Sequence, residues 1–229
     1  MKNTFVISCP IDTYSGYGSR SRDLVKALIN LDKYDVKIMP QRWGNTPWNF
    51  IEDHIEDWGF LQPHILQGQM TQQPDIWAQI TVPNEFQAVG KFNIGITAGI
   101  ETTICAPQWI EGMNRMNLNL VSSEHSKKVF QDSKFQKQDD QTKQVVGTVE
   151  LTAPIEVLFE GVDITKYFQS PLTSTSEVGQ ALDTIEEDFA FLFVGHWLQG
   201  DFGQDRKDIS GLIRVFLETF KNRKTKPAL

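Results

Sequence analysis

The sequence predicts an α/β protein built around a doubly wound parallel sheet. Short apolar runs typical of strands buried on both faces alternate with segments whose apolar residues recur at helical spacing. The connections between these segments are short, and no internal repeat interrupts their order. An alternation of this kind places helices on both faces of a mostly parallel sheet.

Composition indicates a folded chain and disfavours several classes of protein. A length of 229 residues corresponds to one large or two modest domains, at the usual ~150 residues per domain. Hydrophobic residues make up 40% and aromatic residues 11%, which argues against disorder. The net charge is −7 and the one basic cluster is residues 221–226, so nucleic acid is not expected as the main partner.

The sequence also carries signals about compartment and metals. It shows neither the apolar region of a signal peptide nor an apolar run long enough for a transmembrane segment, so we expect a cytoplasmic protein. Cys9 and Cys105 lie far apart and are interpreted as buried, reduced thiols. No metal site is expected, because no ligand spacing is found among the histidines, which are His54, His64, His125 and His196.

The first strand, turn and helix contain the clearest candidate binding feature. Residues 4–8 predict a buried strand, and residues 15–23 read Ser-Gly-Tyr-Gly-Ser-Arg-Ser-Arg-Asp. Apolar residues at helical spacing follow over 24–31. Such a turn presents backbone N–H groups and a helix N-terminus at the end of a strand, where phosphate or another anion can bind. A tight turn without a ligand is the alternative.

This turn does not match the dinucleotide-binding fingerprint. Gly16 and Gly18 are present, but Ser21 stands where a third glycine is required. The second strand, predicted at 34–39, is followed by Pro-Gln instead of the acidic residue that would hold a ribose. A dehydrogenase of the NAD type is therefore disfavoured.

Residues 43–61 are aromatic and acidic, and we interpret them as one amphipathic surface helix. Trp48, Ile51, Ile55 and Trp58 would share its apolar face.

The rest of the first half continues the alternation. A helix is expected at 107–114, and Ser123 is a good N-cap for another helix over 124–130. Residues 131–150 are polar and are interpreted as a loop insertion. Further strands are expected at 63–71, 75–83, 92–97, 118–121 and 155–159.

The C-terminal part begins a second unit. Residues 169–187 are rich in Ser and Thr and indicate a linker. Residues 189–194 read Phe-Ala-Phe-Leu-Phe-Val, which predicts a strand buried on both faces. An apolar helical stripe follows over 209–220. One strand and one helix do not complete a layer, so we expect low stability for this region.

Three stretches, in this order and spacing, resemble the GT-B glycosyltransferases, specifically the retaining group called family 4 or group 1. The first is residues 15–23. The second covers 100–130, with Ile-Glu-Thr-Thr, Pro-Gln-Trp and Leu-Val-Ser-Ser-Glu-His-Ser-Lys-Lys-Val-Phe. The third covers 160–216, with Glu-Gly-Val-Asp, Phe-Val-Gly, Arg-Lys-Asp and Leu-Ile-Arg-Val-Phe.

The resemblance implies two Rossmann-like domains. Residues 1–168 would form the N-terminal, acceptor-side domain, 169–187 a linker, and 188–229 the first strand and helix of an incomplete C-terminal domain. The implied activity is of the hexosyltransferase type: transfer of a sugar, with retention, from a nucleotide-sugar donor to an unknown glycan, lipid or protein acceptor. No cofactor is implied.

The resemblance also assigns roles to single residues. Glu101 would face the reacting sugar, and Gly16, Tyr17 and Gly18 would approach the donor phosphates or the acceptor. Arg206 and Lys207 would neutralise the departing diphosphate, on which negative charge develops. The structural alternatives are a helix N-terminal acid for Glu101 and a solvated lysine for Lys207.

The sequence departs from the family in two places. His196 stands where a basic side chain is frequent, and the glutamate pair that holds the donor's sugar and ribose would lie beyond Leu229. We therefore expect a fragment or a truncated chain. The alternative function is a non-catalytic carbohydrate- or partner-binding module derived from such an enzyme.

Overall fold

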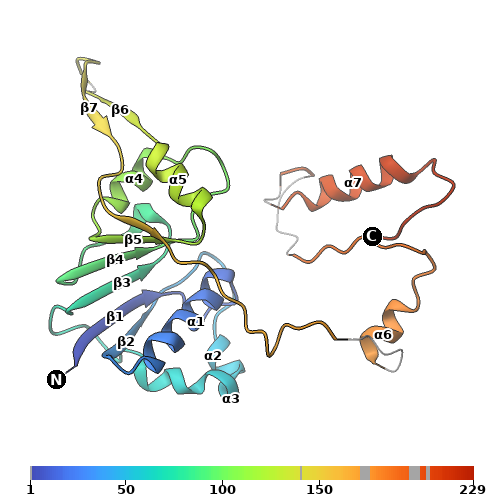
Figure 1. Ribbon diagram of the computed structural model, residues 1–229, viewed down its shortest axis with the longest axis horizontal. Coiled ribbons are helices and arrows are strands. Elements are labelled where there is room, and N and C mark those ends of the chain that lie inside the picture. The colour runs from blue at the N-terminus through green and yellow to red at the C-terminus, as the bar shows by residue number, and fades with distance from the viewer. Residues whose placement is uncertain (1, 140, 171–175, 196–201, 205–206) are drawn as a thin grey trace. The chain divides into compact units, whose positions relative to one another are not determined.

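A six-stranded parallel sheet organises the first of two units in the computed structural model (Figure 1). The units are Met1–Val162 and Asp163–Leu229, a division that falls a few residues before the end predicted for the first domain. The structure describes residues 2–139, 141–170, 176–195, 202–204 and 207–229. Each unit is described by itself.

All neighbouring strands of the sheet are parallel, which confirms the predicted α/β class and is consistent with a Rossmann-like fold. Apolar residues are frequent in the central strands because helices cover both faces of the sheet. The strands are β1 (Asn3–Cys9), β2 (Tyr34–Pro40), β3 (Ile76–Ile80), β4 (Phe92–Ile96), β5 (Leu118–Val121) and β8 (Ile155–Val157), in the spatial order β2-β1-β3-β4-β5-β8.

The strand order reverses between β1 and β3. Outside β2, Ile65 forms a parallel bridge with Ile38, and the Leu66 N–H donates to the Ile38 carbonyl over 2.9 Å. The chain therefore runs outward from β1 through β2 to residues 65–66, and then returns to the other side of β1 as β3. In open α/β sheets, ligands bind outside the carboxyl ends of the strands at such a reversal.

Helices cover both faces of this sheet. Ile7, Val25 and Leu61 are buried in one core cluster, whereas Val6 and Phe130 are buried in a second cluster. Because adjacent strand residues point to opposite faces, Val6 and Ile7 belong to different clusters. The first cluster includes residues of α1 (Gly16–Asn30), α2 (Phe50–Asp53) and the 3-10 helix η1 (Gly59–His64), and the second includes residues of α4 (Pro107–Met113) and α5 (Glu124–Asp132).

The single helix predicted over 43–61 is wrong. The segment forms α2, then α3 (Ile55–Trp58), then η1, and Ile55 is 43% exposed. Tertiary contacts override the helical periodicity here: the Asp12 carboxylate accepts from the Ile51 N–H over 2.7 Å, and Arg22 packs over the Phe50 ring. The strand predicted at 63–71 is also wrong, apart from the bridge at Ile65.

Residues 131–150 contain a β-hairpin where a loop insertion was predicted. The strands β6 (Phe135–Gln138) and β7 (Val145–Val149) pair antiparallel and extend away from α4 and α5 in Figure 1. The Asp139 carboxylate accepts from the Gln141 and Thr142 N–H groups and so closes the turn. Most residues of the two hairpin strands are exposed, including Val145 and Val146 of β7.

The two cysteines are free and buried, which confirms their interpretation as reduced thiols. Burial raises the pKa of the Cys9 thiol to about 12. Within the described residues, no helix combines the length and apolar character needed to cross a bilayer.

In the second unit, the helix predicted over 209–220 is confirmed as α7 (Ile209–Phe220), whose first turn is capped by the Asp208 carboxylate. A short helix, α6 (Glu177–Leu182), lies within the segment predicted to be a linker. The expected loop at Gly195-His196 falls partly outside the described residues, since His196 is not among them.

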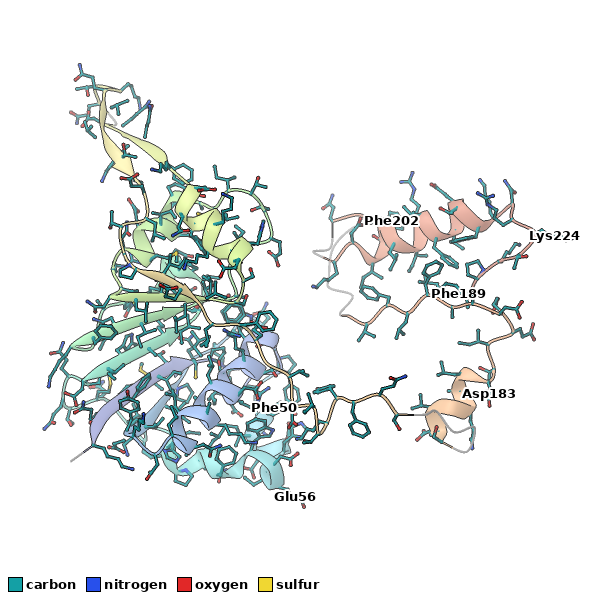
Figure 2. The ribbon with its side chains drawn as sticks, viewed as in Figure 1. Phe50, Glu56, Asp183, Phe189, Phe202 and Lys224 are labelled. Atoms are coloured by element: carbon teal, nitrogen blue, oxygen red, sulfur yellow. The ribbon has the colours of Figure 1, made fainter. Side chains whose placement is uncertain are left out.

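The strand predicted at 189–194, buried on both faces, is wrong. Only one parallel bridge forms there, between Ala190 and Ala228. Phe191 contacts the Phe216 ring of α7, with a centroid separation of 6.2 Å, and Figure 2 labels Phe189 on this same segment. Leu192 is 88% exposed. The apolar run therefore has α7 as a neighbour but is not sandwiched between two layers in the described part of the unit.

We expect the 189–194 segment to be the least protected apolar run in the chain. Its amides should exchange with deuterium at least about 100-fold faster than those of β1 and β3, because local opening there breaks few buried contacts. Hydrogen–deuterium exchange followed by mass spectrometry measures both regions in one sample. Equal protection of the two regions would contradict this expectation.

Candidate functional site

The candidate site lies at the carboxyl ends of β1 and β4, beside the reversal in strand order. Three segments meet there: residues 10–15 after β1, the first turn of α1, and residues 97–101 after β4. Their contacts are described in turn.

Ser15 opens α1 and orients its first turn. Its hydroxyl accepts from the Gly18 N–H over 2.9 Å, as an N-cap does. The N–H groups of Gly16 and Tyr17 precede the first intrahelical hydrogen bonds and so have no helical acceptor. These two donors and the positive end of the helix dipole favour an anion at this position.

Gly16 and Gly18 serve different purposes. A Cβ atom at Gly18 would overlap the Thr13 carbonyl oxygen and lie 2.7 Å from Thr13 Oγ1, so α1 can approach this loop only with glycine there. A Cβ atom at Gly16 would meet no atom within 4 Å. Packing therefore explains Gly18, whereas the side of Gly16 is open for another molecule to approach.

Tyr17 joins the first turn of α1 to the end of β4. Its hydroxyl accepts from the Ala98 N–H over 3.0 Å and lies 3.0 Å from Thr97 Oγ1. Its ring stacks on half-buried Trp43, with centroids 4.0 Å apart. Because its hydroxyl already has protein partners, Tyr17 offers an anion its backbone N–H and not its side chain.

Arg22 holds the loop after β1 and was not singled out from the sequence. Its Nη1 donates to the Ile11 carbonyl over 2.8 Å and to the Thr13 carbonyl over 3.0 Å, and its guanidinium lies 3.5 Å from the Phe50 ring centroid. Burial lowers the pKa of Arg22 to about 10, so it stays protonated at neutral pH. Arg22 lies on the buried face of α1 with Gly18 and Val25, and this helical spacing could have identified it as a buried, structural arginine.

The loop after β4 is fixed at its start and open further on. The Ala98 carbonyl accepts from Ser122 Oγ over 2.7 Å, and Gly99 has a φ of +96° in close contact with Ser126. Glu101 follows as an exposed residue, and its carboxylate has no hydrogen bond or ion pair among the described residues. The structure thus places Glu101 on the same loop as the Tyr17 partners but does not orient its carboxylate.

The basic residues predicted for the diphosphate belong to the second unit. Lys207 is exposed just before α7, and Arg206 lies outside the described residues. The structure therefore brings together Gly16, Tyr17 and Gly18 with residues 97–98. It does not place Lys207 relative to these residues, because Lys207 belongs to the second unit.

Metal chemistry has no candidate centre in the parts of the chain that the structure describes, where no group of three or more His, Cys, Asp and Glu residues could hold an ion. Comparison with protein-family models and with curated proteins found no match to this chain. The functional assignment therefore depends on the sequence motifs and on the geometry above.

The two glycines of the turn make a matched pair for testing this geometry. We expect Gly18→Ala to lower the free energy of unfolding by about 1–3 kcal/mol, because the new methyl group overlaps the loop backbone. Gly16→Ala should leave stability unchanged or raise it by up to about 1 kcal/mol, since the methyl group meets no atom and alanine favours helix. Urea unfolding of both variants measures the difference, and equal losses would contradict the assigned packing.

The hydroxyl of Tyr17 is the second test. Tyr17→Phe leaves the Ala98 N–H and the buried Thr97 hydroxyl without their partner, so we expect a loss of about 1–3 kcal/mol. Tyr14→Phe is the control, because the exposed Tyr14 hydroxyl bonds Asp53 at the surface, its one partner among the described residues, and its removal should cost about 0.5 kcal/mol or less. Chemical denaturation compares them; a Tyr17→Phe variant as stable as the control would refute the bridging role.

Proposed function

We propose that this chain is the acceptor-side region of a retaining GT-B glycosyltransferase, followed by the beginning of its donor-side domain. The observation that supports it best is the first turn of α1. It lies at the reversal in strand order, presents the N–H groups of Gly16 and Tyr17, which have no helical acceptor, and has an open side at Gly16. This is where the sequence resemblance expects the phosphates of a nucleotide-sugar donor.

In the proposed reaction, the bond between the sugar C1 and the diphosphate oxygen breaks, and its electron pair leaves with the diphosphate. An acceptor hydroxyl forms the new bond to C1 from the same face, and its proton passes to the departing phosphate. Catalysis of this kind depends on stabilising the charge that develops on the leaving group, by fixed cations and helix N-termini. Two catalytic carboxylates of the hydrolase kind are not required.

In this proposal, the backbone donors of Gly16 and Tyr17 approach the donor phosphates, and Lys207 supplies a cation to the diphosphate. Arg206 is proposed for the same role. Glu101 faces the reacting sugar, where its exposed carboxylate can accept hydrogen bonds from sugar hydroxyls. Gly18 acts indirectly, because it lets α1 approach the loop at Thr13.

A carbohydrate-binding module without catalysis is the second candidate. The stacked pair of Tyr17 and Trp43 favours it, since aromatic rings beside polar loops are suited to holding the apolar face of a sugar. The unoriented carboxylate of Glu101 is compatible with this candidate as well.

Nucleotide binding by the 229-residue chain tests the proposal. We expect calorimetry to detect UDP or GDP with micromolar affinity, and Lys207→Ala to weaken that binding by about tenfold through loss of a charge-assisted contact. Lys224→Ala is the control, because Lys224 is an exposed lysine of the same unit in the basic cluster near the chain end (Figure 2). Binding that is absent, or that weakens equally in both variants, would contradict the assignment of Lys207.

Turnover separates the two candidates. We expect the chain to release nucleoside diphosphate from at least one member of a panel of UDP- and GDP-linked sugars. Glu101→Gln should slow this release by about 100-fold, whereas Glu111→Gln, an exposed acid on α4, should not change it. Affinity for oligosaccharides without nucleotide binding or release would instead establish the binding module.

A further inference from the structure

Arg20 is a second arginine of α1, and its side chain contacts residues near the end of the first unit. Its Nη2 donates to the Leu158 carbonyl over 2.6 Å, and its Nη1 lies 3.1 Å from Glu160 Oε1. The Arg20 side chain is 10% exposed. A cation from the start of the helix is thus buried against the segment that follows β8.

The two members of this ion pair differ in how firmly they are held. Arg20 Nε is buried and has no hydrogen-bond partner among the described residues, although buried N–H groups are normally paired. The Glu160 side chain is 51% exposed. The guanidinium is therefore a fixed cation with spare donor capacity, and the carboxylate is the partner that solvent and solutes can reach.

Gly16 and Arg20 lie on one face of α1, since they occupy positions i and i+4. Side chains on a helix point back toward its N-terminus, so the Arg20 side chain leads toward the first turn. The side of Gly16 on this face is open. An anion held by the N–H groups of Gly16 and Tyr17 would therefore approach the guanidinium of Arg20.

Residues 159–162, which follow β8, make few contacts apart from those with Arg20. The Leu158 N–H still donates to the Val121 carbonyl over 2.8 Å, continuing the pairing of β8 with β5. For residues 159–162, the ion pair with Arg20 is the one polar contact found within the described residues, and Phe159 is 80% exposed. Arg20 thus fastens the last stretch of chain before the second unit begins at Asp163.

We propose that Arg20 is an anion-responsive latch. A diphosphate at the first turn of α1 competes with Glu160 for the guanidinium, and its binding frees residues 159–162. The competition favours the ligand, because diphosphate carries more negative charge than a carboxylate and makes strong charge-assisted hydrogen bonds with arginine. This inference depends on the proposed function, since it describes how that site controls the connection to the second unit.

The thermodynamic coupling between anion binding and opening of the Arg20–Glu160 pair provides the test. If anion binding opens the latch, then weakening the latch must strengthen anion binding by the same factor. Calorimetry on the full chain with inorganic pyrophosphate should show about two- to fivefold tighter binding for Glu160→Gln. Glu156→Gln is the control, because it removes the same charge from the same segment but breaks the pair with Lys127. Arg20→Gln should weaken binding by about tenfold.

Hydrogen exchange distinguishes the latch from a purely structural role of Arg20, because a structural role predicts no change in exchange rate when pyrophosphate binds. Saturating pyrophosphate should accelerate exchange of the Leu158 amide, which donates to the Val121 carbonyl and directly precedes the freed residues. We expect this in the wild-type chain and in Glu156→Gln, and no change in Glu160→Gln, where the latch is already open. The exposed Glu160 variant keeps the test valid even where Arg20→Gln fails to fold.

The outcomes separate this inference from the proposed function. Pyrophosphate binding that is equal in Glu160→Gln and Glu156→Gln, without a change in exchange, would overturn the latch and leave the proposed function standing. Absence of binding for pyrophosphate, UDP and GDP alike would overturn both.

Discussion

The close approach of α1 to the loop after β1 is the constraint from which the candidate site follows. Gly18 permits this approach because any larger residue would overlap Thr13. Ser15 then caps the helix, and Arg22 bonds the carbonyls of Ile11 and Thr13 from the buried face. The N–H groups of Gly16 and Tyr17 in the first turn then have no helical acceptor.

From this position, α1 reaches the ends of three strands. Arg22 holds the loop after β1, the Tyr17 hydroxyl bonds the end of β4, and the Arg20 guanidinium bonds the segment after β8. The buried guanidinium groups of both arginines donate to backbone carbonyls, although Arg20 Nε has no partner among the described residues. The helix therefore supports the ends of all three strands through its side chains.

The proposed site combines backbone donors with basic side chains, which suits the binding of a phosphate ester. Its one candidate carboxylate, Glu101, is exposed and has no hydrogen-bond or ion-pair partner among the described residues. Lys207 belongs to the other unit, so the proposed reaction requires both units, whereas the anion contacts of Gly16 and Tyr17 require only the first. This difference is why nucleotide binding and sugar transfer can be tested separately.

Local sequence was sufficient for the parallel sheet, the Ser123 cap and α7, because apolar runs and capping residues act over a few positions. It also identified the glycine turn, but it could not separate Gly16 from Gly18, which differ only in what lies beside them. Only tertiary structure decided that Asp12 and Arg22 split the 43–61 segment, that Arg20 reaches Leu158, and that residues 189–194 remain exposed. These outcomes depend on partners distant in sequence, and a residue pattern specifies which face is apolar but not what covers it.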